Sequence, residues 1–394
     1  MGRAEDQQFD VVVIGGGNAG LSAAARLLRT GVTRVAVVEP QTVHTYRPLL
    51  SYVGGGQARL RSAERTQRSV TPSRCTWIRD AAVSVDPGAS TVECATGRRL
   101  SYRDLVIGTG LVPDGDELPG IEAALATPAV ASNYLDHAEK TWELVSAMRR
   151  GHAVFTVPRA PVSCTGTTIK PLFLAADHWR RSGLLPAVRI TLVIDRPQLL
   201  GVPPIDERLS QRLAELDVRV IHGGVAALRP EQQSLTVTGG ETLDYDLLHL
   251  VPPFRGPPWL TACGLTGEQP HGLVDIDPIT LRHRQHPNVW AAGDGAAVDT
   301  DPSGGALRRQ VDIMVYNMGA ARRGETLRSY DGYTVAPVTT DRRRLIAGEF
   351  DRTGAPASSL PSFVDSTKPR RVAWAFDRYA LPQSYWHAIL KGRL

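Results

Sequence analysis

The sequence predicts an α/β protein in which parallel β-sheets carry helices on both faces. Apolar strands alternate with segments of helical periodicity up to residue 222, and several of these strands end in glycine. Such alternation is typical of parallel sheets, because two parallel strands are joined by a crossover that is usually a helix. With 394 residues, 42% hydrophobic and 22% charged, the chain has the size and composition of two to three globular domains.

The first elements form a complete strand–helix–strand unit. Its apolar strands cover residues 10–14 and 34–39, and residues 21–28 between them have helical spacing. Further strands are expected over 76–85, 90–93 and 105–110. A second alternating unit follows, with elements expected over 137–149, 152–157, 168–181, 189–195, 206–216 and 218–222. A last apolar strand covers 288–293, and a segment rich in proline, arginine and aromatic residues begins at residue 330.

A glycine-rich turn separates the first strand from the first helix. Residues 15–20 read Gly-Gly-Gly-Asn-Ala-Gly and match the pattern G-x-G-x-x-G of dinucleotide-binding sites. Its three glycines allow a tight turn, an approach of the backbone to a pyrophosphate, and close packing of helix and strand. The acidic residue that ends the second strand is placed to bind a ribose. The predicted contacts of this turn and strand end are Gly15, Gly17, Asn18, Ala19, Gly20, Glu39 and Pro40.

These residues alone leave NAD and FAD open as the bound dinucleotide. Residues 105–110 and 288–294 resemble the second and third flavin-binding segments of two-dinucleotide-fold flavoproteins. That resemblance implies FAD, with the aspartate that matches Asp294 holding the ribityl chain. It adds the following residues to the cofactor site: Arg47, Val83, Thr109, Gly110, Gly293, Asp294 and Gly305.

The elements group into two Rossmann-like dinucleotide-binding domains and a small C-terminal domain. We expect the FAD-binding domain to combine residues 1–113 with 272–325. The second Rossmann-like domain covers 114–271 and carries Cys164, and the C-terminal domain covers 326–394.

The second domain lacks the motif that would bind a second nucleotide. Flavoproteins of this kind place another G-x-G-x-x-G after the strand that matches residues 152–157, for NAD(P)H. Here that loop has no glycine pair, and Pro158 and Pro161 have no backbone N–H to offer a phosphate. A nicotinamide donor is therefore not expected, and Cys164 stands where another reductant would act.

Cys164 lies just before the helix expected over 168–181, with Thr167 and Thr168 as the expected cap residues. A helix N-terminus stabilises a thiolate and lowers its pKa, which makes Cys164 a candidate catalytic nucleophile. The alternative is a small, buried apolar residue. Lys170 is one of only four lysines and opposes the dipole of the same helix, which suggests a catalytic role for its charge. The alternative for Lys170 is a solvated surface position.

The chain is similar over nearly its whole length to the mitochondrial-like branch of the sulfide:quinone oxidoreductases. The segments that carry this resemblance are residues 44–48, 54–56, 132–134, 139–142, 161–164, 249–253, 293–294, 330–334, 347–351 and 385–386. The resemblance implies FAD, a sulfide or thiol substrate, a quinone acceptor and a pair of redox cysteines. Cys164 matches the cysteine next to the flavin. The second family cysteine directly follows the Gly-Asp motif, and here that position is Gly295.

We therefore predict an FAD-dependent oxidoreductase of the sulfide:quinone type, which oxidises sulfide, a persulfide or a thiol through Cys164 and passes the electrons to a quinone or another acceptor. An external thiol would take the sulfur that the missing cysteine would accept. Two alternatives stay open. One is a repurposed single-cysteine flavoenzyme for another thiol or small organic substrate, with Gly295 opening space beside the flavin. The other is an FAD-binding protein that does not oxidise sulfide and serves as an assembly or regulatory partner.

Charge, cysteine spacing and hydropathy exclude other classes of function. The net charge of +5 comes from arginines spread along the chain, so no nucleic-acid partner is expected. The cysteines Cys75, Cys94, Cys164 and Cys263 have no metal-ligand spacing, so no metal site is expected. The sequence shows no signal peptide and no apolar run of about 18 residues. We expect a cytoplasmic protein with peripheral contact at the inner face of the membrane.

Overall fold

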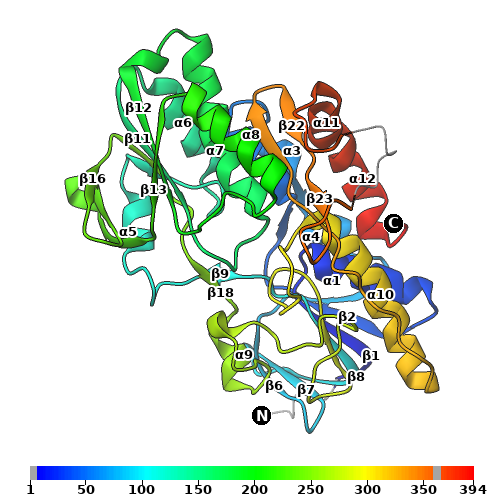
Figure 1. Ribbon diagram of the computed structural model, residues 1–394. Helices are drawn as coiled ribbons and strands as arrows, with labels where there is room; N and C mark the ends of the chain where they lie inside the picture. The colour runs from blue at the N-terminus through cyan, green and yellow to red at the C-terminus, as the bar shows by residue number, and fades with distance from the viewer. Residues whose placement is uncertain (1–6, 358–364) are drawn as a thin grey trace.

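The computed structural model describes residues 7–357 and 365–394, which form two α/β bodies side by side (Figure 1). The first body is built on a sheet of order β5-β2-β1-β8-β7-β6, with β19 paired to β8. Its parallel strands are β1 (Gln7–Ile14), β2 (Val35–Val38), β5 (Thr76–Ile78), β8 (Arg99–Ile107) and β19 (Val289–Ala291). Its antiparallel strands are β6 (Ala82–Asp86) and β7 (Thr91–Cys94).

The central strand β1 explains the continuous apolar run near the start of the sequence. Val13 stands opposite Val37 of β2 on one side and Val106 of β8 on the other, and all three are buried. A parallel strand that is covered on both faces is apolar at every position rather than at alternate ones. Helices α1 (Asn18–Arg29) and α10 (Gly304–Arg323) pack against each other beside this sheet.

The second body contains a fully parallel sheet of order β10-β17-β11-β12-β13. Its strands are β10 (Val130–Ala131), β17 (Leu247–His249), β11 (Gly151–Val157), β12 (Val188–Ile194) and β13 (Val218–His222). Its main helices are α6 (Ala138–Ala147), α7 (Thr165–Arg181) and α8 (Pro203–Glu215). A small antiparallel sheet is attached to it, formed by β14 (Val225–Arg229), β15 (Ser234–Val237) and β16 (Thr242–Asp244).

Two short strands join the bodies. The chain leaves the first body through β9 (Val112–Pro113) and returns through β18 (Phe254–Arg255), and these strands pair with each other between the bodies (Figure 1). The remaining elements are β3 (Val43–Thr45), α2 (Leu50–Gly54), α3 (Leu60–Ala63), β4 (Glu64–Thr66), α4 (Gln67–Val70), α5 (Ile121–Ala126) and α9 (Pro258–Ala262). The single strand expected over 76–85 is wrong: the chain breaks it at residues 79–81 into β5 and β6.

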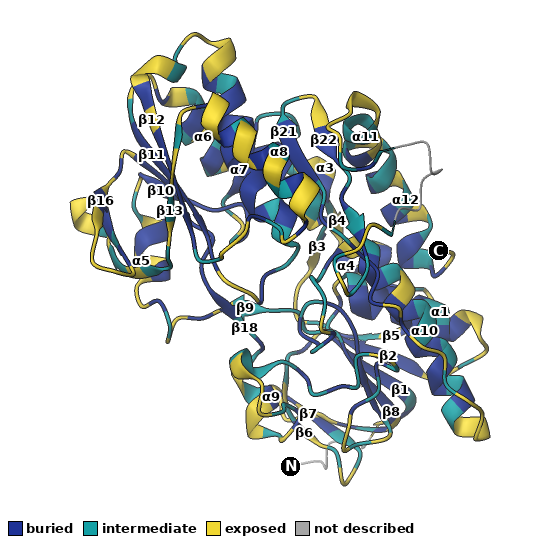
Figure 2. Ribbon diagram, in the orientation of Figure 1, coloured by how far each residue is buried: buried dark blue, intermediate teal, exposed yellow. Residues whose placement is uncertain are grey.

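The C-terminal segment contributes to both hydrophobic cores. Its elements are β20 (Thr334–Val335), β21 (Val338–Asp341), β22 (Arg344–Ile346), β23 (Glu349–Phe350), α11 (Arg371–Ala375), a π-helical turn (Phe376–Ala380) and α12 (Leu381–His387). Val338 and Ile346 belong to the core of the second body, whereas Tyr385, Trp386 and Leu390 belong to the core of the first. Buried residues fill both sheets and the helix faces toward them (Figure 2). The division of the chain into three domains stays a prediction.

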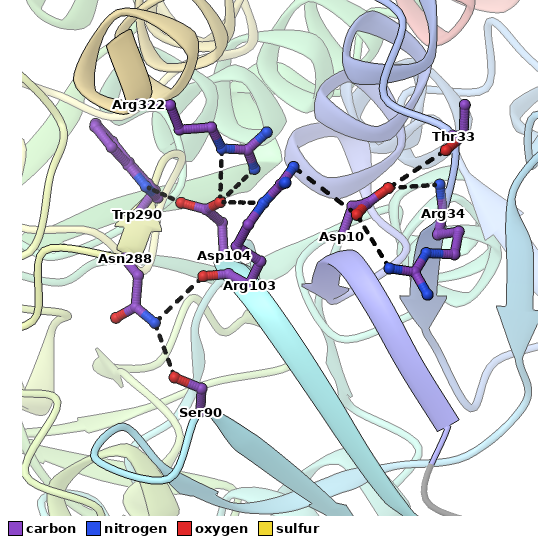
Figure 3. A network of polar contacts seen from close by, with 9 residues as sticks. All are labelled: Asp10, Thr33, Arg34, Ser90, Arg103, Asp104, Asn288, Trp290 and Arg322. Atoms are coloured by element: carbon purple, nitrogen blue, oxygen red, sulfur yellow. Dashed lines mark hydrogen bonds and ion pairs between the residues drawn. The ribbon is translucent and has the colours of Figure 1, made fainter. Parts of the chain in front are cut away.

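A network of charged side chains ties α10 to the first sheet (Figure 3). The Asp104 carboxylate of β8 accepts hydrogen bonds from Trp290 Nε1 at 3.4 Å and from Arg322 Nε at 3.0 Å. Arg103 lies 3.8 Å from Asp104 and 3.8 Å from Asp10 of β1, so one guanidinium bridges two neighbouring strands. The side chain of Asp104 is 8% exposed. This network holds the end of α10 against strands β8 and β19.

Candidate active site

The glycine-rich turn lies at the carboxyl ends of the parallel strands, where α/β proteins bind ligands. Gly15 has a φ of +100°, and a Cβ there would stand 2.4 Å from the carbonyl oxygen of Gly108. A Cβ on Gly20 would stand 1.8 Å from the carbonyl oxygen of Gly15. These two positions therefore accept only glycine, because the turn after β1, the start of α1 and the end of β8 meet in backbone contact.

The start of α1 has the features of an anion-binding site. Gly17 is its N-cap residue, and no side chain caps the helix. A Cβ on Gly17 would meet no atom within 4 Å, so the space beside this residue is open. Asn18 and Ala19 follow in the first turn, where free N–H groups and the helix dipole favour phosphate. The residues present therefore fit the pyrophosphate of a dinucleotide.

The other predicted contacts surround this opening. The Glu39 carboxylate accepts hydrogen bonds from the backbone N–H groups of Gly16 at 2.7 Å and of Gln41 at 2.8 Å, which fixes its orientation at the end of β2. Pro40 follows at the surface. Val83 falls where the register between β6 and β7 shifts, and it is 44% exposed. Its backbone therefore stands outside the regular ladder at this edge of the sheet.

The Gly-Asp motif follows β19 and faces the second body. Gly293 has a φ of +85°, and its N–H donates to Gln310 Oε1 of α10 at 3.0 Å. Burial raises the pKa of Asp294, while a hydrogen bond from the Ser163 hydroxyl and the charge of Arg47 oppose this rise. Ser303 caps α10, because its Oγ accepts the N–H of Ala306 at 3.0 Å.

Three further predicted contacts lie near this motif. Thr109 has a buried Oγ1 without a hydrogen-bond partner among the described residues, which leaves a donor and acceptor for a ligand. Gly110 has a φ of +65° and open space where a Cβ would be. Gly305 serves packing: a Cβ there would stand 2.4 Å from Val335 Cγ2, so its absence lets β20 lie against the start of α10.

Cys164 is itself the N-cap residue of α7, with a φ of +56°. The helix begins at Thr165, three residues before the expected start, so the prediction that Thr167 and Thr168 cap it is wrong. The backbone N–H of Cys164 donates to the carbonyl oxygen of Pro302 at 2.8 Å, and the Thr167 hydroxyl donates to its Sγ at 3.2 Å. The cysteine loop of the second body is thus bonded to the loop that follows the Gly-Asp motif of the first.

The expected low pKa of the Cys164 thiol is also wrong. Burial raises the pKa of Cys164 to about 11, and the charge of Asp301 adds to this rise. The hydrogen bond from Thr167 and the charge of Lys170 lower the pKa, but they are weaker effects. Desolvation and a nearby carboxylate together outweigh the helix N-terminus. The sequence alone did not show that the carboxylate of Asp301, from a distant part of the chain, lies at the N-terminus of α7.

That acid, Asp301, occupies the N-terminus of α7. Its carboxylate accepts the backbone N–H of Thr165 at 3.1 and 3.2 Å, and the Thr165 hydroxyl donates to the same group. Beside it, a Cβ on Gly166 would stand 2.9 Å from the backbone carbon of Ala336. A carboxylate and a backbone segment of the protein therefore fill the place where a second nucleotide would put its pyrophosphate. This agrees with the absence of a second glycine motif.

Lys170 is completely buried, so its interpretation as a solvated surface residue is wrong. Its Nζ lies 3.5 Å from Asp377 Oδ2, in the π-helical turn of the C-terminal segment, and the Tyr52 hydroxyl donates to the same oxygen at 2.6 Å. The ion pair attaches α7 to the C-terminal segment. A catalytic role for Lys170 stays a prediction.

The neighbourhood of Gly295 contradicts the idea that this glycine opens space. A Cβ on Gly295 would stand 2.6 Å from the carbonyl oxygen of Gly110, so the backbone after β8 fills the position. All four cysteines are free. Cys263 accepts the backbone N–H of Val85 at 3.2 Å beside β6, whereas Cys164 caps α7 in the other body.

Three residues of this site escaped the sequence interpretation: Ser163, Arg196 and Asp301. Ser163 bonds to Asp294, and Asp301 bonds to α7. Arg196 donates through Nε to the carbonyl oxygen of Pro158 at 2.8 Å, while its two terminal nitrogens are buried without a hydrogen-bond partner among the described residues. No local sequence motif identifies these three residues, because each of them bonds to a segment that is distant in the sequence.

The comparisons with known proteins agree with this architecture. Residues 9–158 match the family model of pyridine nucleotide-disulphide oxidoreductases. In fold, the chain is similar to a chain of the Tetrahymena thermophila mitochondrial ATP synthase structure, with a TM-score of 0.84, 20% identity and coverage of 100% of this chain and 98% of that one. It is similarly close to the sulfide:quinone oxidoreductase of Aquifex aeolicus, with a TM-score of 0.79, 18% identity and coverage of 98% and 92%. The expected fold class is confirmed.

The sequence comparison goes further than the fold. The chain is 32% identical to the mitochondrial sulfide:quinone oxidoreductase of Mus musculus, over 98% of this chain and 87% of that protein. The similarity covers nearly the whole chain. The chain therefore belongs to the sulfide:quinone oxidoreductase family.

Proposed function

We propose that this protein is an FAD-dependent oxidoreductase that oxidises sulfide, or a thiol or persulfide, through Cys164 and delivers the electrons to a quinone. The observation that carries the proposal is the contact between the cysteine loop and the Gly-Asp loop. Ser163 bonds to Asp294, and the N–H of Cys164 bonds to Pro302. The thiol therefore stands beside the segment that in this family holds the flavin.

The open start of α1 supports FAD as the cofactor. The N–H groups of residues 17–19 would bind the pyrophosphate, and Glu39 would accept the ribose hydroxyls. Asp294 would hold the ribityl chain, with Thr109 and Gly110 lining the same opening. When bound, the flavin supplies a two-electron acceptor beside the cysteine.

Cys164 is the sulfur-carrying residue of this mechanism. Its thiolate and a hydrosulfide ion would form a sulfur–sulfur bond and yield a cysteine persulfide; the proton of the hydrosulfide would go to water, and the two electrons lost would be accepted by the bound flavin. An external thiolate then attacks the outer sulfur, so that the sulfur–sulfur bond breaks and Cys164 leaves as thiolate. The external thiol takes the role of the cysteine that Gly295 replaces. Lys170 favours the thiolate by its charge, and Asp301 disfavours it.

Anaerobic addition of sulfide to the purified yellow protein tests the proposal. We expect the flavin absorbance to bleach in the wild type and to persist in Cys164→Ser. Cys263→Ser is the matched control, because this cysteine is also free and partly exposed but lies beside β6. An unbleached wild type, or equal bleaching in Cys164→Ser, would contradict sulfide oxidation through this residue.

The surface of the C-terminal segment supports peripheral contact with a membrane that carries the quinone. Val372 is 80% exposed, Phe376 55% and Tyr379 57%, and their spacing places them on one face of a helical segment. Arg370 and Arg371 begin this segment and would attract anionic headgroups. No helix in the described ranges is long and apolar enough to cross a membrane.

A second candidate function is an FAD-binding assembly partner without sulfide oxidation. Two observations favour it: the backbone contact that fills the position of the second cysteine, and the raised pKa of Cys164. The closely similar fold in the ATP synthase structure shows that this architecture also occurs within a larger assembly. This candidate predicts bound FAD that neither sulfide nor any thiol reduces.

A further inference from the structure

A pocket of about 430 Å³ lies on the side of α7 away from its cysteine, near the C-terminal end of that helix. It forms where α6, α7, the turn between β21 and β22 and the residues after α2 meet. In Figure 1 the β21–β22 hairpin lies between α7 and α11. The pocket is lined by Gln57, Trp142, His178, Arg181, Arg342 and Arg343. Its charged lining is therefore entirely basic.

The positive charge of this pocket is not neutralised within the described residues. No carboxylate lies within ion-pair distance of Arg181, Arg342 or Arg343 in the ranges 7–357 and 365–394. Burial lowers the pKa of Arg342; the charge of Asp177 opposes this shift, and the weaker effects of the charges of Arg181 and Arg343 add to it. Like charges are thus held together where an anion would relieve their repulsion.

Parts of the pocket are fixed by the fold. The Arg342 guanidinium donates to the carbonyl oxygen of Gly55 and, at 3.5 Å, to that of Gly56, and it lies 5.5 Å over the ring of Trp142. Gln57 donates through Nε2 to the carbonyl oxygen of Arg342 at 2.5 Å. Its Oε1 is buried without a hydrogen-bond partner among the described residues. The wall of the pocket is therefore ordered before any ligand arrives, which lowers the entropic cost of binding.

One residue of the pocket wall, Gln57, is hydrogen-bonded to the C-terminal segment. Arg378 donates to the carbonyl oxygen of Gln57 at 2.7 Å through one terminal nitrogen and at 3.3 Å through Nε. Arg378 belongs to the same π-helical turn as Phe376 and is followed by Tyr379, both largely exposed. Gln57 therefore connects the pocket wall to the turn that carries these two side chains.

We infer that this pocket binds the phosphate group of an anionic ligand, through the guanidinium groups of Arg181, Arg342 and Arg343. Guanidinium groups match phosphate oxygens in charge and in bidentate geometry. The phosphate comes either from a lipid headgroup at a membrane surface or from a soluble phosphorylated compound. This site lies outside the machinery of the proposed reaction and does not depend on it.

The test uses the protein with its flavin bound, so that phosphate does not titrate the dinucleotide site. Binding of inorganic phosphate and pyrophosphate is measured by calorimetry in wild type, in Arg181→Gln/Arg343→Gln and in the control Arg150→Gln/Arg344→Gln. All four arginines are exposed, and both double variants lose the same charge. We expect the pocket variant to bind at least about tenfold more weakly, because charge-assisted hydrogen bonds are lost, and the control to bind as the wild type does.

A second arm identifies the source of the phosphate. Co-sedimentation is measured with phosphatidylcholine vesicles that do or do not contain phosphatidylglycerol. Selective loss of binding to the anionic vesicles in the pocket variant supports a lipid headgroup, whereas equal vesicle binding with weakened phosphate binding supports a soluble ligand. Equal effects of both double variants in both arms would show diffuse charge attraction and overturn the inference. Absence of any phosphate or vesicle binding by the wild type would also overturn it.

Discussion

The carbonyl oxygen of Gly110 stands 2.6 Å from the point that a Cβ on Gly295 would occupy. The turn after β8 and the Gly-Asp loop therefore touch through their backbones at the position where the family carries its second redox cysteine. A side chain at residue 295 requires the backbone at residue 110 to move. In this chain that position is therefore occupied by a backbone contact and not by an empty space.

Restoring the cysteine alone should not restore a disulfide. We expect Gly295→Cys and Gly295→Ala to lower the melting temperature to a similar extent, corresponding to about 1–3 kcal/mol of overpacking strain, since both add the Cβ. Differential scanning calorimetry measures this loss, and thiol titration reports whether Cys164 and the new cysteine pair. A stable Gly295→Cys variant with an oxidised pair would contradict the contact described here.

The raised pKa of Cys164 sets the pH dependence of its reactivity. With a pKa of about 11, only ~0.1% of the thiol is ionised at pH 8. Alkylation by iodoacetamide, followed by mass spectrometry, should therefore be slow at pH 8 and accelerate up to pH 11. Asp301→Asn should make it roughly three- to tenfold faster at pH 8, because the variant removes a negative charge that disfavours the thiolate.

Asparagine keeps an oxygen that can accept the Thr165 N–H, so the start of α7 remains capped in Asp301→Asn. Asp299→Asn is the matched control, because Asp299 is exposed and pairs with Arg352. If Asp301→Asn slowed alkylation, or if Asp299→Asn accelerated it equally, the electrostatic effect of Asp301 on the thiol would be refuted.

Local sequence patterns predicted those parts of the fold that depend on neighbouring residues. The apolar run of β1, the glycine-rich turn and the helical spacing of α1 lie within one stretch of chain, so their structure follows from periodicity and backbone sterics. The start of α7 does not follow in this way. Asp301 caps that helix from 136 residues away, and no pattern around Cys164 contains this information.

Two alanine substitutions in the glycine-rich turn distinguish glycines that are needed for packing from a glycine that is needed for cofactor binding. Gly20→Ala would place its Cβ 1.8 Å from the carbonyl oxygen of Gly15, so we expect little folded protein. Gly17→Ala would meet no protein atom within 4 Å, so we expect it to fold but to retain less flavin. Circular dichroism measures the fold, and the absorbance ratio of flavin to protein measures the cofactor. Full flavin content in Gly17→Ala would contradict the placement of the pyrophosphate.

Variants of the buried ion pair between Lys170 and Asp377 distinguish a structural role of Lys170 from an effect of its charge on the Cys164 thiol. Lys170→Met leaves the carboxylate buried without its cation, and we expect a loss of about 3–5 kcal/mol in the free energy of unfolding. Asp377→Asn should destabilise as well, and urea denaturation of the double variant measures the coupling between the two. Lys170→Met should also slow alkylation of Cys164, because the lysine charge lowers the pKa of that thiol. If Cys164 were alkylated in Lys170→Met at the wild-type rate, the predicted effect of the lysine charge on the thiol would be contradicted, and the role of Lys170 would be structural only.

The network around Asp104 should contribute to stability more than the neighbouring pairs of Asp10 do. Asp104→Asn weakens contacts to Arg322 and Arg103 at a carboxylate that is itself only 8% exposed, and we expect a loss of about 2–4 kcal/mol. Asp10→Asn should cost about 0.5–1 kcal/mol, because Arg34 and Arg103 are more than half exposed. Urea denaturation at pH 7 compares the two, and equal losses would contradict this ranking.

The contribution of Asp10 to the free energy of unfolding should decrease at acid pH. Burial raises its pKa, but the backbone N–H of Arg34 and the charges of Arg103 and Arg34 outweigh this effect, so the folded pKa lies below 3.8. The stabilisation from Asp10 is therefore complete above the unfolded pKa and is lost as the pH falls through the folded value. The stability difference between wild type and Asp10→Asn should be constant near pH 7 and begin to decrease below about pH 4 in a urea series between pH 7 and pH 3.

Residues of the C-terminal segment were the hardest to interpret from the sequence. Tyr385 was recognised only as part of a family motif, but its hydroxyl lies 2.6 Å from His44 Nε2, and His44 Nδ1 donates to the carbonyl oxygen of Gly16 at 3.0 Å. Burial lowers the pKa of His44, in agreement with a neutral imidazole that donates at one nitrogen and accepts at the other. Hydropathy could not predict this link, because it joins segments 341 residues apart.

The same tail has a consequence for how the protein is made. A ribosome releases the strands of the first sheet early, but the apolar surface beside α1 is covered only when Tyr385, Trp386 and Leu390 arrive. Folding of a domain while its chain is still being synthesised requires that all its core residues have emerged. The core that supports the glycine-rich turn is therefore complete only after this C-terminal segment has been synthesised.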